Sequence, residues 1–195
     1  VRNIDKYEKE YCSTDFEQKY MVNYRRQKVL EILREYKHEY VLEIGCGMNS
    51  LAEFVTDYRE FTIVEPGEYF LANVKENLKD KAGIIYFHGF IEEMEEKLQK
   101  RKYDTIIVSS LLHEVEEPIR FLKVVNSLCD ANTVVHINVP NEKSIHRIIA
   151  YECGLIEYLA EQSERNILLQ QNRVFNLESL EGIIHQSGET DIIDK

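Results

Sequence analysis

The sequence of 195 residues has no tryptophan, few glycines and prolines, and only four cysteines. Eight glycines and three prolines are too few for a collagen-like or low-complexity chain, and a hydrophobic content of 44% excludes a wholly disordered one. The cysteines at positions 12, 46, 129 and 153 form no C-x-x-C pair, so no metal site or redox motif is predicted. We therefore expect reduced thiols and one domain spanning residues 1–195.

Long apolar runs and an excess of basic residues are also missing. No uncharged apolar stretch approaches the ~18 residues of a membrane span, and the first residues lack the apolar core of a signal peptide. Lys and Arg number 24 against 35 Asp and Glu, which gives a formal net charge of −11. We expect a cytoplasmic protein that binds neither membrane nor nucleic acid. The oligomeric state stays open.

Short apolar runs alternate with amphipathic stretches along most of the chain. The runs rich in β-forming residues cover 40–44, 61–64, 84–87, 105–109 and 133–139. Helical patterns separate or precede them at 14–36, 50–57, 69–78, 91–100 and 117–128. Strands that alternate with helices indicate a parallel sheet covered on both faces. The sequence therefore predicts a doubly wound, mostly parallel α/β fold of the Rossmann-like kind.

Three segments lie outside this alternation. Residues 1–37 form an N-terminal helical segment whose aromatic residues favour packing, with a closing role over a ligand as the alternative for Tyr20 or an arginine. Residues 141–171 contain two helical stretches, Lys143–Cys153 and Leu155–Gln171. They are interpreted as a cap over the ligand crevice, or else as a hairpin on the sheet edge. A last helix, 177–186, precedes a sixth predicted strand at 190–193.

The first apolar run ends in a glycine loop, Glu43-Ile44-Gly45-Cys46-Gly47. Glycine allows a ligand to approach the backbone closely, and the next helix would offer free N–H groups. Glu43 lies inside the apolar run, where a charge requires a partner such as a cationic or hydroxyl-bearing ligand. Glu65 ends the second run, 20 residues after Gly45, where a carboxylate reaches ribose hydroxyls. Ribose next to a cation describes S-adenosylmethionine better than a dinucleotide.

The glycine loop resembles motif I of the class I S-adenosylmethionine-dependent methyltransferases. Phe61–Pro66 is similar to the second motif, and His88–Glu92 lies where family members hold the adenine. Tyr103–Val115 resembles the fourth strand and following turn of the small-molecule branch. The resemblance implies S-adenosylmethionine as cofactor, bound by Glu43, Gly45, Cys46, Gly47, Glu65, Pro66, Phe90, Ile91 and Ser109.

The chain departs from the family pattern at several positions. Asn49 replaces the third glycine of the fuller motif, and Phe90 stands where many relatives carry an aspartate. The family's sheet usually has seven strands and only six runs precede Lys195, so the C-terminal strand is expected to be missing. The signature of enzymes that methylate amino groups of bases is absent at 109–112. This absence favours methylation of oxygen or carbon of a small-molecule metabolite.

His113, just beyond the fourth run, is the candidate catalytic residue, as a general base or a substrate-orienting group. His136 is interpreted as a core residue, whereas Asn138 lies nearer the crevice; His146 and Arg147 could bind an acidic substrate group. Two alternatives to a methyltransferase stay open. One is a catalytically silent cofactor-binding module, and the other is an NAD-dependent oxidoreductase, which would require a glycine at Ser50.

Overall fold

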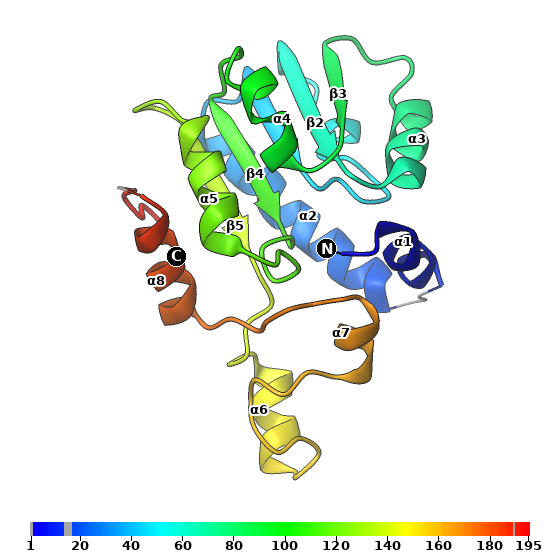
Figure 1. Cartoon of the computed structure of the whole chain (residues 1–195), viewed down its shortest axis with the longest axis vertical. Coiled ribbons are helices and arrows are strands. Elements are labelled where there is room, and N and C mark those ends of the chain that lie inside the picture. The colour runs from blue at the N-terminus through cyan, green and yellow to red at the C-terminus, as the bar shows by residue number, and fades with distance from the viewer. Residues whose placement is uncertain (1, 14–16, 189) are drawn as a thin grey trace.

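The computed structural model describes residues 2–13, 17–188 and 190–195. Within these ranges a five-stranded sheet has the order β3-β2-β1-β4-β5, and every neighbouring pair is parallel. Its strands are β1 (Tyr40–Ile44), β2 (Glu60–Glu65), β3 (Ile84–His88), β4 (Thr105–Ser109) and β5 (Val134–Asn138). The doubly wound α/β prediction is confirmed (Figure 1).

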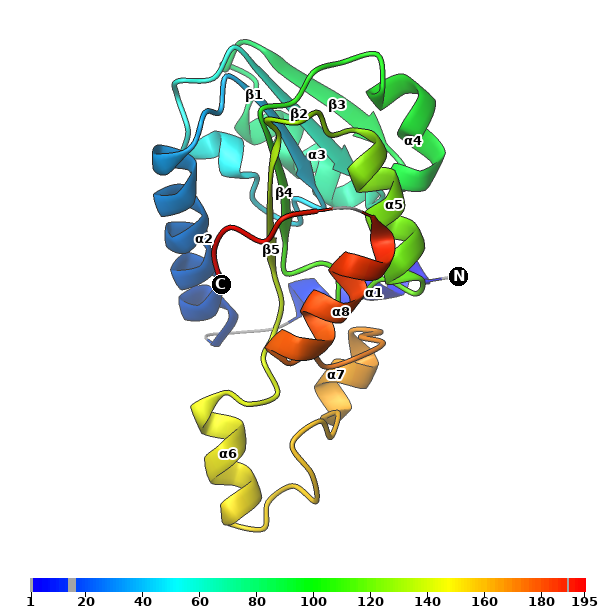
Figure 2. The same cartoon turned by 90° about the vertical axis from the view of Figure 1, so that its left-hand side faces the viewer.

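Helices cover both faces of the sheet (Figure 2). The helices are α1 (Ile4–Cys12), α2 (Glu17–Glu35), α3 (Glu68–Asn77), α4 (Ile91–Leu98), α5 (Pro118–Ser127), α6 (Ile145–Glu152), α7 (Glu164–Leu168) and α8 (Leu177–Ser187), with a 3-10 turn η1 (Leu51–Glu53). Apolar residues of α2 and α3 pack on one face, and those of α4, α5 and α8 pack on the other. Because both faces are covered, the strands are apolar on both sides.

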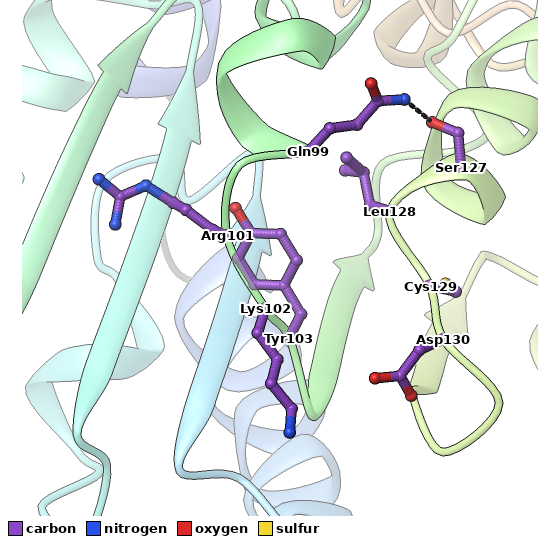
Figure 3. Close-up of a pocket in the computed structure, with 8 residues that line it drawn as sticks. All are labelled: Gln99, Arg101, Lys102, Tyr103, Ser127, Leu128, Cys129 and Asp130. Carbon is purple, nitrogen blue, oxygen red and sulfur yellow. Dashed lines mark hydrogen bonds between the residues drawn. The ribbon is translucent and has the colours of Figure 1, made fainter.

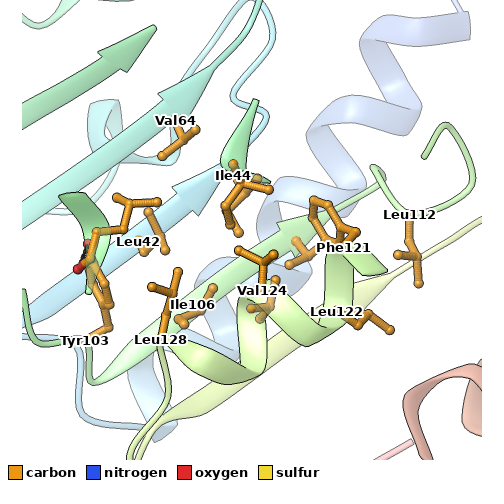
Figure 4. Packing of buried hydrophobic residues seen from close by; sticks show 14 of the residues in the cluster. Leu42, Ile44, Val64, Tyr103, Ile106, Leu112, Phe121, Leu122, Val124 and Leu128 are labelled. Carbon is orange, nitrogen blue, oxygen red and sulfur yellow. Dashed lines mark hydrogen bonds between the residues drawn. The ribbon is translucent and has the colours of Figure 1, made fainter. Parts of the chain in front are cut away.

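The larger core cluster lies between the sheet and the helices α4 and α5 (Figure 4). Leu42 of β1 and Ile106 of β4 are register partners and are fully buried. Phe121 of α5 packs in the same cluster. This packing fixes β1 beside β4 and so sets the position of the loops that follow the two strands.

The strand order reverses between β1 and β4, since β2 and β3 lie on one side of β1, and β4 and β5 lie on the other. In an open parallel sheet the loops after such strands diverge and leave a crevice at the carboxyl edge. α1 and the segment that carries α6 and α7 lie at this edge of the molecule (Figure 1). The fold therefore brings the glycine loop, His113 and the predicted cap to one end of the sheet.

Two predicted elements are wrong. Residues 190–193 form no strand, and Ile193 is 65% exposed, so this apolar run does not pair with the sheet. The helix predicted over 50–57 is only the short η1, because Ser50 caps the turn and Phe54 already ends it. The start predicted for the long N-terminal helix at Thr14 lies outside the described residues, and α2 is described from Glu17.

The 141–171 insertion is less helical than predicted. Its first helix, α6, lies inside the expected stretch, but the second stretch contains only the short α7. Arg147 donates hydrogen bonds to the carbonyl oxygens of Leu159 and Glu161, which holds that backbone in an irregular path. Ser163 then caps α7 by accepting a bond from the Asn166 N–H. Local polar contacts thus replace the long helix that the apolar spacing predicts.

Replacing Ile106 by Ala tests the core between β1, β4 and α5. The change leaves a cavity in a fully buried position, so we expect the free energy of unfolding to fall by about 2–5 kcal/mol. Urea unfolding followed by circular dichroism measures it. The matched control, Ile193→Ala at an exposed position, is expected to change stability by less than about 0.5 kcal/mol. Equal losses in the two variants would contradict the described core.

Candidate functional site

The loop after β1 is built around two glycines with positive φ angles, 75° at Gly45 and 56° at Gly47. A Cβ atom at Gly45 would lie 3.1 Å from the Leu111 side chain, so both the backbone angle and the space favour glycine. The Gly45 N–H donates to the Val64 carbonyl oxygen at 2.9 Å. The loop is therefore held against the end of β2, and its backbone faces the crevice.

Glu65, the last residue of β2, joins the two loops that border the crevice. One carboxylate oxygen accepts a 3.0 Å bond from the Gly47 N–H, and the other accepts a 2.8 Å bond from the Gly67 N–H. The Cys46 thiol lies 3.6 Å from the same carboxylate. Burial raises the pKa of Glu65, although the two N–H groups oppose this shift. The carboxylate keeps further acceptor capacity toward the crevice.

Glu43 is buried at the end of β1 and finds its partners within the chain. The Leu51 N–H lies 3.0 and 3.2 Å from its two oxygens, and the Ser50 hydroxyl donates a further hydrogen bond. Burial raises the pKa of Glu43 to about 7, against the opposing effect of these bonds. Glu43 therefore has hydrogen-bond partners without a ligand. Glu43 fixes the backbone between the glycine loop and η1.

Helix α1 covers the crevice beside β2. The rings of Tyr7 and Tyr11 lie against Phe70, with centroid separations of 6.1 and 5.4 Å. The Glu8 carboxylate accepts bonds from the Tyr69 N–H at 3.0 Å and the Phe70 N–H at 3.2 Å, and so caps α3. Of the four tyrosines predicted to pack in the N-terminal segment, Tyr7 and Tyr11 do so against the rim of the site. The prediction is wrong for Tyr20 and Tyr24 of α2, which are 61% and 58% exposed.

A buried ion pair ties the start of the chain to the segment after β4. The Arg2 guanidinium lies 2.6 Å from the Glu114 carboxylate, which also accepts a 3.1 Å bond from the Tyr7 hydroxyl. Burial raises the pKa of Glu114, and Arg2 opposes this shift. Neither Arg2 nor Glu114 was predicted as a site residue. The pair is separated by 112 positions and only the fold brings it together.

His113 is 3% exposed and lines the crevice next to this pair. Its Nε2 atom lies 3.8 Å from a Glu114 oxygen, and its Nδ1 atom has no hydrogen-bond partner. Burial, together with the charges of Arg25 and Arg2, lowers the pKa of His113 to about 4. The ring is therefore neutral near pH 7. A neutral ring can accept or donate a hydrogen bond, but it binds a proton weakly.

The carboxyl ends of β4 and β5 carry a second polar group. Ser110 has a φ angle of 53°. Its N–H and its hydroxyl donate to the side-chain oxygen Oδ1 of Asn138, at 2.9 and 2.8 Å. The Asn138 amide lies 3.0 Å from the Ser109 hydroxyl and 2.9 Å from His136 Nε2. Burial lowers the pKa of His136. This network keeps Ser110 in a strained conformation beside His113.

One cavity of about 830 Å³ joins these groups. Of the predicted site residues, its lining contains Glu43, Gly45, Cys46, Gly47, Glu65, Pro66, Ser109 and His113, together with His136, Asn138, His146 and Arg147. Phe90 and Ile91 are not in the lining, and Ile91 is 2% exposed in the hydrophobic core. Their contact with an adenine stays a prediction. Residues of the 141–171 insertion line the cavity, as the cap interpretation requires.

A smaller hollow of about 240 Å³ lies between the ends of α4 and α5 (Figure 3). It is lined by Gln99, Arg101, Lys102, Tyr103, Ser127, Leu128, Cys129 and Asp130. Gln99 and Ser127 close one side with a 3.2 Å hydrogen bond. The hollow borders the amino end of β4, opposite the glycine loop, and contains none of the predicted site residues. The larger cavity is the candidate functional site.

Comparison with known proteins identifies the fold. Residues 42–135 match the family model of a methyltransferase domain. A possible histamine N-methyltransferase from Thermotoga maritima has 17% identical residues and a TM-score of 0.63, with 97% of this chain and 82% of that chain covered. A methyltransferase from Archaeoglobus fulgidus has 18% identity and a TM-score of 0.60, with 91% and 76% covered. The fold is that of the class I S-adenosylmethionine-dependent methyltransferases.

A third solved structure is the plantazolicin methyltransferase BamL, with 17% identity and a TM-score of 0.61. The aligned region covers 83% of this chain and spans 60% of the length of BamL. No curated protein matches the sequence. None of the described helices is both long and apolar enough to cross a membrane. In the described ranges, no three His, Cys, Asp or Glu residues gather in a group that could hold a metal ion.

Replacing Glu43 by Gln tests the raised pKa. Between pH 4.5 and about 7 the folded state keeps a proton that the unfolded state has lost, so stability falls as pH rises through this window. We expect the unfolding free energy of the wild type, relative to the variant, to fall by about 3 kcal/mol across it.

Urea unfolding at several pH values between 4.5 and 8 measures this difference. Gln retains an acceptor for the Leu51 N–H, so the variant is expected to fold. The control is Glu178→Gln at an exposed position of α8, which changes the charge without changing the site. A wild-type-minus-variant difference that is constant with pH would show that Glu43 ionises normally.

Proposed function

We propose that this protein is an S-adenosylmethionine-dependent methyltransferase that acts on oxygen or carbon of a small-molecule metabolite. The observation that carries the proposal is the single cavity that joins Glu65 and the glycine loop to the polar ends of β4 and β5. One end offers a carboxylate and close backbone, which suits a nucleoside. The other end, at the carboxyl ends of β4 and β5, offers polar side chains that suit contact with a second molecule. The methyltransferase domain match over residues 42–135 supports the same activity.

The residues at the first end fit the cofactor. Glu65 accepts two backbone N–H bonds and has remaining lone pairs for the ribose hydroxyls. Gly45 and Gly47 remove side-chain bulk where the methionine part would pass, and Glu43 shapes the loop beside them. Cys46, Pro66 and Ser109 complete the proposed contacts. When bound, S-adenosylmethionine supplies a methyl group on a positively charged sulfur, which is already strongly electrophilic.

We propose that His113 orients the acceptor as a neutral hydrogen-bonding group and does not act as a strong base. Its pKa of about 4 supports this role, because such a ring removes a proton from a hydroxyl poorly. Methyl transfer to a nucleophile that is already reactive needs alignment above all, and alignment can supply much of the acceleration. In the proposed reaction, His113 therefore holds the acceptor in the position for transfer.

Isothermal calorimetry with S-adenosylmethionine, S-adenosylhomocysteine and NAD tests the proposal. We expect both adenosyl compounds to bind and NAD to give no heat. Binding of NAD alone would favour the oxidoreductase. That class requires a glycine at position 50, where this chain has a serine. Binding without release of S-adenosylhomocysteine, in a screen of metabolites, would favour a catalytically silent module. Failure of both adenosyl compounds to bind would overturn the methyltransferase proposal.

Replacing Glu65 by Gln tests the nucleoside end. A hydrogen bond to a charged group contributes about 1.5–3 kcal/mol, so we expect the affinity for S-adenosylhomocysteine to fall about 10- to 150-fold. Calorimetry measures it. The control is Glu60→Gln at the opposite end of β2, whose side chain pairs with Arg101 away from the cavity. An unchanged affinity in Glu65→Gln would remove this residue from the cofactor site.

His113 provides a separate prediction. Since its pKa is about 4, we expect its ring carbon NMR signals to stay at neutral-ring positions from pH 6 to pH 8. We expect His113→Gln to lower the rate of methyl transfer about tenfold with the same factor at each pH in that range. The control is His185→Gln on the exposed surface of α8. A loss that appears only above a pKa near neutrality would support general-base catalysis instead.

A further inference from the structure

The charge of the cavity is opposite to that of the protein. Within the described part of the chain, seven permanently cationic side chains line it, against three carboxylates. The cations are Arg2, Arg25, Arg26, Lys28, Arg147, Arg165 and Arg173, and the carboxylates are Glu43, Glu65 and Glu114. The whole chain has 24 basic and 35 acidic residues. Composition alone therefore does not produce this gathering of arginines.

The carboxylates and the arginines come from different elements of the fold. Glu43 is the penultimate residue of β1 and Glu65 is the last residue of β2, at the proposed nucleoside end. Glu114 is compensated by the Arg2 guanidinium at 2.6 Å. The other cations come from α2 and from residues 147–173. Lys28 pairs with Glu31 at 2.7 Å, so the arginines account for the excess of positive charge in the cavity lining.

Arg25 of α2 borders the cavity. Val29 and Leu33 are buried against the sheet, and Arg25 precedes Val29 by one helical turn on the same side of α2. The Arg25 side chain lines the cavity there. The Arg25 charge helps to lower the pKa of His113, and it opposes the rise that burial causes in the pKa of Tyr11. Arg25 and His113 thus border the same space from α2 and from the segment after β4.

Buried polar atoms without partners mark the same space. His113 Nδ1 and Arg173 Nε are buried and make no hydrogen bond in the described structure. A buried donor without an acceptor costs about 1–3 kcal/mol. A ligand oxygen that accepts from these atoms would remove part of that cost.

We propose that the methyl acceptor is an organic oxyanion, a carboxylate or a phosphate monoester, held between Arg25 and His113 and methylated on its charged oxygen. The inference rests on the proposed function, because it names the substrate class of the same cavity. It also selects oxygen over carbon as the acceptor atom. Planar arginine groups suit carboxylate and phosphate oxygens, to which they donate two parallel bonds.

The reaction balances without a base. A lone pair of the oxyanion forms the new O–CH3 bond while the S–CH3 bond breaks, and its electron pair stays on sulfur. The products are a methyl ester and the neutral thioether S-adenosylhomocysteine. No proton is removed from the acceptor, which agrees with the neutral state of His113. The negative charge on the oxygen and the positive charge on the sulfur disappear together.

Matched probes test the proposal in the intact protein saturated with S-adenosylhomocysteine. The carboxylate arm compares benzoate with benzamide and octanoate with octanamide; the phosphate arm compares phenyl phosphate with phenol. In at least one arm we expect the anion to bind tenfold or more tightly than its neutral partner. Arg25→Gln should lower anion affinity about 10- to 150-fold and leave the neutral probes within about twofold.

Three further measurements complete the design. Arg25→Lys keeps the positive charge and is expected to restore most of the anion preference. Arg120→Gln, an exposed arginine of α5 paired with Glu117, should behave as the wild type. The affinity for S-adenosylhomocysteine should stay within about twofold in all variants. Anion binding should also raise the pKa of the His113 ring, which NMR titration detects.

Two results would overturn the proposal. In the first, S-adenosylhomocysteine binds but no anion in either arm is preferred over its neutral partner. In the second, Arg25→Gln weakens anions and neutral probes equally. Either result leaves the methyltransferase proposal standing, whereas a wild-type protein that does not bind S-adenosylhomocysteine removes both.

Discussion

The candidate site depends on two buried carboxylates at the ends of adjacent strands. Glu65 accepts the N–H groups of Gly47 and Gly67, and Glu43 accepts the Leu51 N–H. Each carboxylate pays a desolvation cost that is visible in its raised pKa. Their hydrogen bonds fix the backbone at Gly47, Leu51 and Gly67 in one arrangement at the carboxyl edge of the sheet. The shape of the nucleoside end follows from this arrangement, since the glycines alone would leave the loop with many conformations.

Contacts between distant segments close the rest of the site. Helix α1 lies over Phe70 through Tyr7 and Tyr11, and Arg2 anchors its start on Glu114. The Asn3 N–H donates to the Gln170 side chain at 2.8 Å, so the start of the same helix also contacts the 141–171 insertion. Residues of α1, of the strand ends and of the insertion therefore line one cavity.

The parts that could be predicted from the sequence are those governed by local pattern. β1 and β4 have the predicted bounds because continuous apolar runs end at a glycine loop and at a polar turn. Residues 155–162 are not helical because Arg147 binds their carbonyl groups, and apolar spacing carries no information about such a bond. The ion pair of Arg2 and Glu114 could not be predicted either, because it joins positions 112 residues apart. The glycine loop could be placed at the cavity from the sequence because its position depends on a local pattern at the end of β1.

The proposed reaction gives the charge pattern of the cavity a single explanation. Glu43 and Glu65 hold the loops where a cationic donor would lie, and Arg25 borders the same cavity as His113, where we propose that an anionic acceptor binds. Each reactant is thus stabilised by the opposite charge, while transfer neutralises both reactants. The products then lose the attraction that held the substrates, because an ester and a thioether carry no charge at the reacting atoms. A site that binds the charged pair more strongly than the neutral pair favours release after transfer. Arg25 would contribute to this release, because its attraction to the acceptor oxygen weakens once that oxygen is methylated.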